Sequence, residues 1–156
     1  APKRQMTLVA EETVLKYDSK HHELLTNPIK TVFLFNDEFT NYLDSEVVKA
    51  ALKLLRALNY NVRIIDHPDS GRTFLSKGFL EQAKKVANDN ITAFRSLISK
   101  ETPLLGLEPP ATTSIRDKYL RQAHDIRAAN NLSNTISLTE ELYNTQILAC
   151  TLSYTL

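Results

Sequence analysis

The chain has 156 residues, of which 42% are hydrophobic and 24% charged, and its formal net charge is +1. This is the composition of one soluble globular domain, which at this length buries roughly 70% of its unfolded surface without a metal or disulfide. Basic and acidic residues are mixed, which argues against a nucleic-acid partner, and no apolar run approaches the ~18 residues of a membrane span. The single Cys150 excludes an intrachain disulfide and fits a reducing compartment.

The ends of the chain predict a segment of a longer protein, because it starts at Ala1 and stops in the apolar run "TLSYTL". Residues 1–29 are polar and weakly periodic, and we expect them to form a lead-in to a domain over residues 30–156. His21 and His22 lie in this lead-in. Adjacent residues point to different faces of an element, so a shared metal is not expected there.

Four short apolar or β-branched runs predict β-strands. They lie at residues 30–35, 59–66, 102–109 and 135–138. The first run reads as a strand that is buried on both faces. The third must stop at Pro109 and Pro110, because proline cannot donate a hydrogen bond to a sheet.

Amphipathic patterns between these runs predict helices. The first begins near Asp44 or Ser45, and its apolar positions are Val47, Val48, Ala51, Leu54, Leu55 and Leu58. The clearest stripe consists of Phe79, Leu80, Ala83, Val86, Ala87, Ile91, Phe94, Leu97 and Ile98. A third helix is expected to be capped by Thr112, Thr113 or Ser114, and a last one to start at Thr139. We expect loops at "HPDSGRTFLSKGF" (67–79) and "AANNLSN" (128–134).

The alternation of strands and helices predicts an α/β fold, a three-layer αβα domain with a mostly parallel sheet of about four strands. In such sheets, ligands bind beyond the carboxyl ends of the strands. The segments 36–42, 67–74 and 108–114 therefore define a candidate crevice. Its candidate residues are Asp37, Asp69, Ser70, Gly71, Arg72, Glu108 and Thr112, with Asn36 and Glu38 beside them.

Each candidate residue has an alternative role. Gly71 could allow a positive φ or a close approach of the backbone to a ligand, or it could serve an ordinary turn. Arg72 could hold an anion, or it could pair with Glu108 or Asp37. Ser70 has no neighbouring histidine to act as a base, so a nucleophilic role is not expected.

The remaining polar groups of the three loops suggest little chemistry. The acids Asp37, Glu38, Asp69 and Glu108 could hold a hard divalent cation, although scattered loop acids are usually solvated. His67 is expected to be a turn residue. The sequence "SGRT" lacks the glycines and the lysine of a phosphate-binding loop.

Several spaced motifs occur in the run "LFNDEFTNYLDSEVVKAALKLLRALNYNVRIIDHPDSGRTFLSKGFLEQAKKVANDNI" and in "PLLGLEPPATTSIRDKYL" after it. They are Gly-Arg, Ser-Lys-Gly, Gly-Leu-Glu-Pro and Arg-Asp, in this order. Together they resemble the cysteine-rich "CCG" domain of heterodisulfide reductase-like subunits, lactate-utilisation iron–sulfur proteins and FAD-linked D-lactate and glycolate oxidases. The resemblance covers residues 30–122 and is strongest for the C-terminal domain of the FAD-linked oxidases.

The resemblance implies where a cluster would be held in other members of the family. There, Cys-Cys-Gly stands where this chain has Asp69, Ser70 and Gly71, and a second pair of ligand positions falls near Glu108 and Ala111. None of these residues is cysteine here, and iron–sulfur clusters are held by thiolates. The resemblance therefore implies a cluster-free scaffold in a parent oxidoreductase that carries FAD and iron–sulfur clusters elsewhere.

Three functions are compatible with the sequence. The first is an accessory or docking domain whose partners are the other domains of the parent. The second is a module that binds a small organic anion, and the third is a structural or oligomerising domain, so a homo-oligomer is left open. The resemblance implies a cytoplasmic location, with peripheral attachment to a membrane through the parent also left open.

Overall fold

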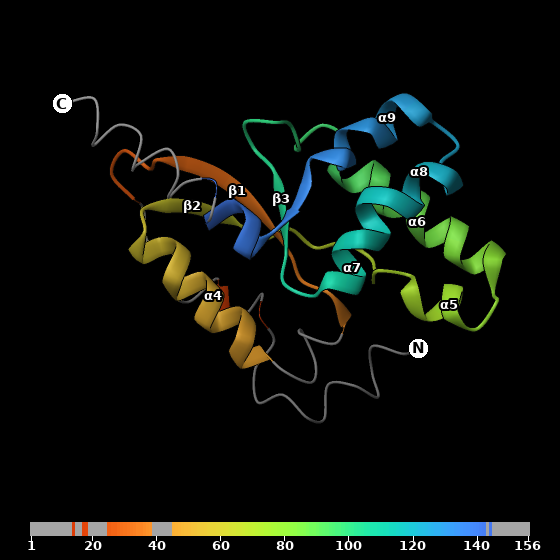
Figure 1. Cartoon of the computed structure of the whole chain (residues 1–156), viewed down its shortest axis with the longest axis horizontal. Coiled ribbons are helices and arrows are strands. Elements are labelled where there is room, and N and C mark those ends of the chain that lie inside the picture. Colours follow the sequence, from red (N-terminus) through yellow and green to blue (C-terminus); the bar gives the residue numbers. More distant parts are fainter. Residues whose placement is uncertain (1–13, 15–16, 19–24, 39–44, 143, 145–156) are drawn as a thin grey trace.

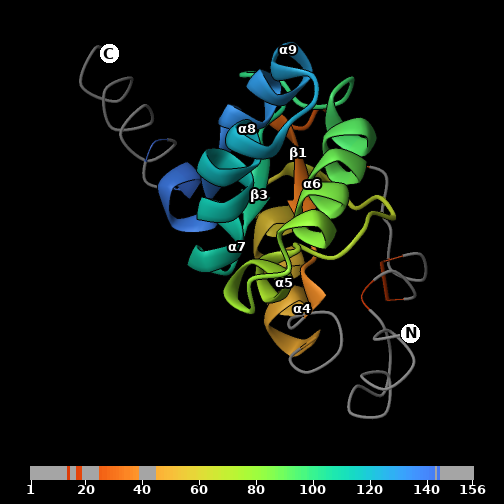
Figure 2. The ribbon, with the colours of Figure 1, turned by 90° about the vertical axis from the view of Figure 1, so that its right-hand side faces the viewer.

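The computed structural model describes residues 14, 17–18, 25–38, 45–142 and 144 (Figure 1). Within this part of the chain, four parallel strands form one sheet with helices on both faces (Figures 1 and 2). The predicted three-layer α/β architecture is confirmed. The predictions for His21, His22, Asp44 and Cys150 and for most of the lead-in fall outside the described residues.

The sheet has the strand order β2-β1-β3-β4. Its strands are β1 (Lys30–Phe35), β2 (Tyr60–Arg63), β3 (Leu104–Gly106) and β4 (Thr135–Ser137). In the register, Val32 lies beside Val62, and Phe33 lies beside Leu104. The second and third strands are shorter than the predicted runs, because only residues 60–63 and 104–106 pair with a neighbouring strand.

The helices differ more from the sequence pattern than the strands do. They are α4 (Ser45–Ala57), α5 (Arg72–Ser76), α6 (Leu80–Phe94), α7 (Pro109–Thr113), the π-helical turn η1 (Ser114–Lys118), α8 (Tyr119–Gln122), α9 (Ile126–Asn130) and the 3₁₀ turn η2 (Asn131–Asn134). Residues 138–142 are also helical, which agrees with the predicted last helix. The elements α7, η1 and α8 follow one another without a break.

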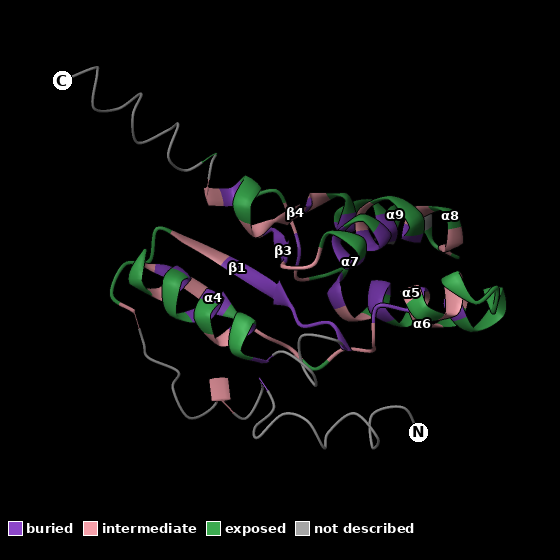
Figure 3. Ribbon diagram, turned by 60° about the horizontal axis from the view of Figure 1, so that its bottom comes forward, coloured by how far each residue is buried: buried purple, intermediate pink, exposed green. Residues whose placement is uncertain are grey.

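The hydrophobic core lies on the two faces of the sheet, and β1 contributes to both. Phe33 and Phe35 pack with α6, α7 and η1, whereas Val32 and Leu34 pack with α4. This alternation follows from the two-residue period of a strand. All four side chains are at most 4% exposed, so the prediction of a strand buried on both faces is confirmed. Figure 3 shows the buried strands between the helices.

Three predictions about helix boundaries were wrong. The segment "AANNLSN" is not a loop, because α9 and η2 occupy it. The segment 67–79 contains the short helix α5. The third helix is not capped by Thr112, Thr113 or Ser114: it starts at Pro109, with Glu108 at the cap position. Proline suits the first turn of a helix because no backbone donor is needed there.

Not every residue of the apolar patterns is buried. Val47 and Leu54 on α4 are 45% exposed, and Leu58 just after the helix is 44% exposed, while the buried apolar side chains of α4 are Val48, Ala51, Leu52 and Leu55. The apolar set is wider than one helix face, and the sheet covers the face that includes Leu52. Phe79 and Leu80, where α6 begins, are 52% and 63% exposed.

None of the helices in the described residues is both long enough and apolar enough to cross a bilayer.

Candidate functional site

The carboxyl ends of β1 and β3 mark the place where the order of the strands in the sheet reverses, since β2 is added on one side of β1 and β3 on the other. The connection from β1 to β2 contains α4 on one face, and that from β2 to β3 contains α6 on the other. Because β1 lies between β2 and β3, the loops after β1 and β3 diverge at this edge. Such switch points are the usual ligand sites of open parallel sheets.

The buried carboxylate of Glu38 organises the loop after β2. Its oxygens accept hydrogen bonds from the Ser70 backbone N–H at 2.8 Å, the Ser70 hydroxyl at 2.9 Å and the Thr73 hydroxyl at 3.3 Å. Glu38 is 5% exposed and Ser70 is 0% exposed. Three donors offset part of the cost of burying a carboxylate. Glu38, from the loop after β1, therefore holds the loop after β2 in place by hydrogen bonds, and we call the loop after β2 the closed loop.

Two residues from distant elements hold the same loop from the other side. The Tyr119 hydroxyl donates to the Ser70 carbonyl at 2.7 Å, and the Asn90 side-chain amide donates to the Asp69 carbonyl at 2.8 Å. The same amide donates to the Tyr119 hydroxyl at 3.0 Å. Burial raises the pKa of Tyr119 above its usual 10.0, so the hydroxyl remains protonated and can donate.

Gly71 adopts the left-handed conformation, with φ of 73°, at the start of α5. A Cβ atom there would lie 3.2 Å from Cγ1 of Val86. Both facts favour glycine, so the positive φ considered from the sequence is confirmed.

Arg72 follows this glycine and pairs with Asp37, with 4.0 Å between the guanidinium and the carboxylate. The pairing with Asp37 that the sequence left open is thus observed.

His67 packs as a structural residue at the end of the loop. Its ring stacks on Phe35 at a centroid distance of 4.2 Å and contacts the ring of Phe94. Nε2 accepts from the Asn36 N–H at 3.2 Å, and Nδ1 lies 2.7 Å from the Pro68 carbonyl. These partners assign the proton to Nδ1 of a neutral imidazole. No hydrogen-bonded turn contains His67, so its observed role is packing against Phe35 and Phe94.

Gly106 lets α7 approach β3 closely. A Cβ atom at this position would lie 1.9 Å from Oγ1 of Thr112 and 3.0 Å from its Cβ. Thr112 is 5% exposed, and its hydroxyl donates to the Glu108 carbonyl at 2.9 Å. The Gly-Leu-Glu-Pro motif therefore includes a contact between a strand and the helix that follows it.

An open groove of about 740 Å³ lies between α5 and the helical run of α7 and η1, which we call the α5–α7 groove. The residues that line it are Arg72, Thr73, Leu75, Ser76, Pro109, Pro110, Thr113, Ser114 and Lys118. Of the seven candidate residues, Arg72 alone belongs to this lining. Ser70, Gly71 and Thr112 are buried, and Asp37 is 2% exposed. A shared ligand crevice of all seven residues stays a prediction.

Sequence reasoning missed residues that act from outside the three loops. Asn90, Tyr119 and Lys118 come from α6, α8 and η1, and no motif links them to position 70. One signal was available for Asn90, because an amide within the apolar stripe of a buried helix needs a buried partner. For Tyr119 and Lys118 we find no such signal.

Comparison with known proteins adds one relation. Over 88 residues, 56% of this chain, the sequence is 26% identical to a D-2-hydroxyglutarate dehydrogenase of Haemophilus influenzae. Over 90 residues, 58% of the chain, it is 29% identical to the enzyme of Pseudomonas putida and 27% identical to that of Escherichia coli. The chain is similar to a small part of D-2-hydroxyglutarate dehydrogenases.

In these three dehydrogenases, the matched stretch spans 9% of the relative's length. The chain is thus related to one region of much larger oxidoreductases. No family model matches the chain, and no solved structure matches it significantly.

The side chains at the cluster positions implied by the family resemblance do not fit an iron–sulfur cluster. Ser70 and Ala111 are buried among protein atoms, and the Ser70 hydroxyl already donates to Glu38. Oxygen and methyl groups are poor substitutes for thiolates on iron. As for the divalent-cation alternative, no three His, Cys, Asp or Glu side chains are grouped for a metal within the described residues.

Proposed function

We propose that this chain is an accessory domain of a larger oxidoreductase related to D-2-hydroxyglutarate dehydrogenases. It packs against other domains of that enzyme and contributes no iron–sulfur cluster. The observation that carries this proposal is the match of 88–90 residues to 9% of three long dehydrogenases. A match confined to so small a region suits a domain whose catalytic parts lie elsewhere.

The closed loop at the switch point supports a role without chemistry. Glu38, Tyr119 and Asn90 use their polar groups to fix residues 69–70 in place. These polar groups make hydrogen bonds within the protein, which preserve the shape of the loop. None of the three side chains activates a nucleophile or a base at residues 69–70. By the family resemblance, FAD and iron–sulfur clusters belong to other parts of the parent.

The outer face of α4 supports a packing role. The α4 stripe consists of Val47 and Leu54 on α4 and Leu58 directly after it, whose N–H donates to the Leu54 carbonyl at 3.0 Å as in a helix. Their separations of seven and four residues place them on one side. Each is 44–45% exposed although each is apolar. A contiguous apolar stripe on a surface helix is typical of a protein contact. We assign this contact to the other domains of the parent.

A substitution in the intact oxidoreductase tests this assignment. Leu54→Glu places a charge in the α4 stripe, while Lys53→Ala changes the neighbouring exposed residue and serves as the control. We expect Leu54→Glu to leave flavin reduction by D-2-hydroxyglutarate unchanged and to lower turnover with the electron acceptor several-fold. Equal behaviour of the two variants would contradict docking through α4. A loss of flavin reduction in Leu54→Glu alone would instead favour the structural alternative.

Anaerobic reconstitution with iron and sulfide tests the absence of a cluster. The purified chain should stay colourless, because the loop residues offer oxygen and methyl groups where a cluster needs thiolates. Stoichiometric iron and acid-labile sulfide with visible charge-transfer absorption would overturn this part of the proposal. Mass spectrometry of the chain before and after treatment checks that Cys150 is unmodified.

A further inference from the structure

The α5–α7 groove combines positive charge with an absence of acids among its described lining residues. Arg72 enters it from α5, and Lys118 enters it from the end of η1. Lys118 forms no ion pair with any described residue. Arg72 also lies 4.0 Å from Asp37, and a guanidinium carries five N–H donors in all. Two cations from facing elements favour a ligand with two negative groups.

A buried hydroxyl adds a second, independent feature. Ser114 is 1% exposed and lines the groove, yet its hydroxyl makes no hydrogen bond to another residue in the described part of the chain. Buried hydroxyls usually have a partner, so one that reaches a groove calls for a ligand atom or a water. Thr113 beside it also makes no side-chain hydrogen bond to a described residue. These hydroxyls can donate to carboxylate oxygens.

The helix that carries these groups is irregular at the same place. Residues Ser114–Lys118 form a π-helical turn between α7 and α8. Such single-turn insertions often occur at functional sites. Here the turn begins at Ser114 and ends at Lys118, both of which line the groove.

The groove also has an apolar part, formed by Leu75, Pro109 and Pro110. Inorganic phosphate or sulfate would gain nothing from this surface, whereas a short carbon chain would. We propose that the α5–α7 groove binds a small organic dicarboxylate, with its carboxylates at Arg72 and Lys118 and its carbon chain on the apolar part. The groove of about 740 Å³ is large enough for such a ligand. This site does not depend on the accessory role.

Titration of the 156-residue chain with glutarate, followed by amide resonances in NMR correlation spectra, tests the proposal. We expect saturable shifts at residues 72–76 and 111–118, with a dissociation constant of about 1 mM or below. There are three comparison ligands: butyrate, inorganic phosphate, and the neutral diol with as many carbons as glutarate. Each should bind at least about tenfold more weakly, because each lacks one charge, both charges or the carbon chain.

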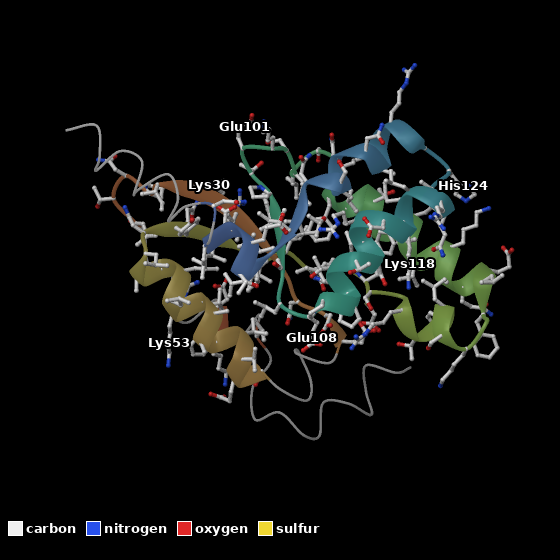
Figure 4. The ribbon with its side chains drawn as sticks, viewed as in Figure 1. Lys30, Lys53, Glu101, Glu108, Lys118 and His124 are labelled. Carbon is white, nitrogen blue, oxygen red and sulfur yellow. The ribbon has the colours of Figure 1, made fainter. Side chains whose placement is uncertain are left out.

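Three variants locate the site. Lys118→Met should weaken glutarate binding about tenfold, and Ser114→Ala should weaken it about fivefold. Lys53→Met removes an exposed charge from α4, far from Lys118 in Figure 4, and should leave binding unchanged. Dispersed spectra of each variant show that it is folded. The proposal is overturned if glutarate causes no shifts up to about 20 mM, or only shifts in other elements. It is also overturned if phosphate or butyrate binds as tightly as glutarate, or if Lys118→Met and Lys53→Met bind glutarate equally.

Discussion

Replacing Gly106 with alanine tests the close packing that positions one wall of the α5–α7 groove. The new Cβ would lie 1.9 Å from Oγ1 of Thr112, so these atoms must separate by roughly 1 Å. Thr112 is 5% exposed and cannot turn its hydroxyl into solvent without a cost. Either the side chain rotates and loses its bond to the Glu108 carbonyl, or α7 moves away from β3.

The size of the effect follows from these contacts. Loss of the 2.9 Å hydrogen bond costs about 1 kcal/mol, and overpacking in a filled interior costs about 1–3 kcal/mol. Alanine lowers the entropy of the unfolded chain, which returns roughly 0.5–1 kcal/mol. We therefore expect Gly106→Ala to lower the free energy of unfolding by about 2 kcal/mol. With a urea m-value of about 2 kcal/mol/M, the midpoint should fall by about 1 M.

A double-mutant cycle separates the contact from a general effect on β3. Thr112→Ala removes Oγ1, which leaves only the 3.0 Å approach of the two Cβ atoms. In the Thr112→Ala background, Gly106→Ala should lower the free energy of unfolding by at least about 1 kcal/mol less than it does in the chain that keeps Thr112. Urea unfolding followed by circular dichroism measures all four proteins. A loss below about 0.5 kcal/mol for Gly106→Ala, or additivity in the cycle, would refute the reasoning.

Three further predictions concern the closed loop, and urea unfolding measures each of them. Glu38→Gln should cost about 1–3 kcal/mol, because an amide nitrogen then faces the Ser70 donors. Tyr119→Phe should cost about 1–2 kcal/mol near neutral pH, and it should make the loss of stability at alkaline pH less steep. Gly71→Ala should cost about 0.5–1 kcal/mol more than Gly78→Ala, because both glycines have positive φ but a Cβ has open space only at Gly78.

The sign of the pH effect follows from the direction of the Tyr119 pKa. Burial raises the pKa of its hydroxyl above 10.0, so the unfolded chain releases this proton at a lower pH than the folded chain does. The stabilisation is fully present below about pH 10 and is lost as the pH rises further. An unfolding free energy measured from pH 8 to 11 should therefore fall less in Tyr119→Phe. Identical slopes would contradict the assignment of a buried, protonated hydroxyl.

Matched surface changes control the other two experiments. Glu46→Gln alters an acid whose side chain is 81% exposed and paired with Lys49, so it should change stability by less than about 0.5 kcal/mol. If Glu38→Gln costs no more than this control, Glu38 does not organise the loop. If Gly71→Ala and Gly78→Ala cost the same, the contact with Val86 is not a constraint.

Much of the sheet could be predicted from the sequence because its strands have a strong local pattern. The run that became β1 is apolar on both faces, and a short strand buried in this way has few alternatives. The loops after β1, β2 and β3 then follow from the rule for parallel sheets. The rule brings Asp37 and Arg72 near each other, and the structure pairs them.

The detail of the site could not be predicted because it depends on contacts between distant residues. Tyr119 reaches the Ser70 carbonyl from 49 positions away, and nothing local marks this. On α4, the apolar residues were too many to identify one buried face: the pattern included Leu54, which is exposed, and omitted Leu52, which is buried. Tertiary packing, not periodicity, chooses between such faces.

The two proposed surfaces lie on opposite sides of the sheet, which makes their tests independent. The α4 stripe belongs to the helix that packs on Val32 and Leu34, whereas α7 and η1 pack on the face of Phe33 and Phe35. Docking through α4 would therefore leave the α5–α7 groove open to solvent. A variant in the stripe should spare glutarate binding, and Lys118→Met should spare coupling to the parent. If either variant abolished both properties, the two faces would be coupled through the sheet, and the picture of a rigid scaffold with separate surfaces would be wrong.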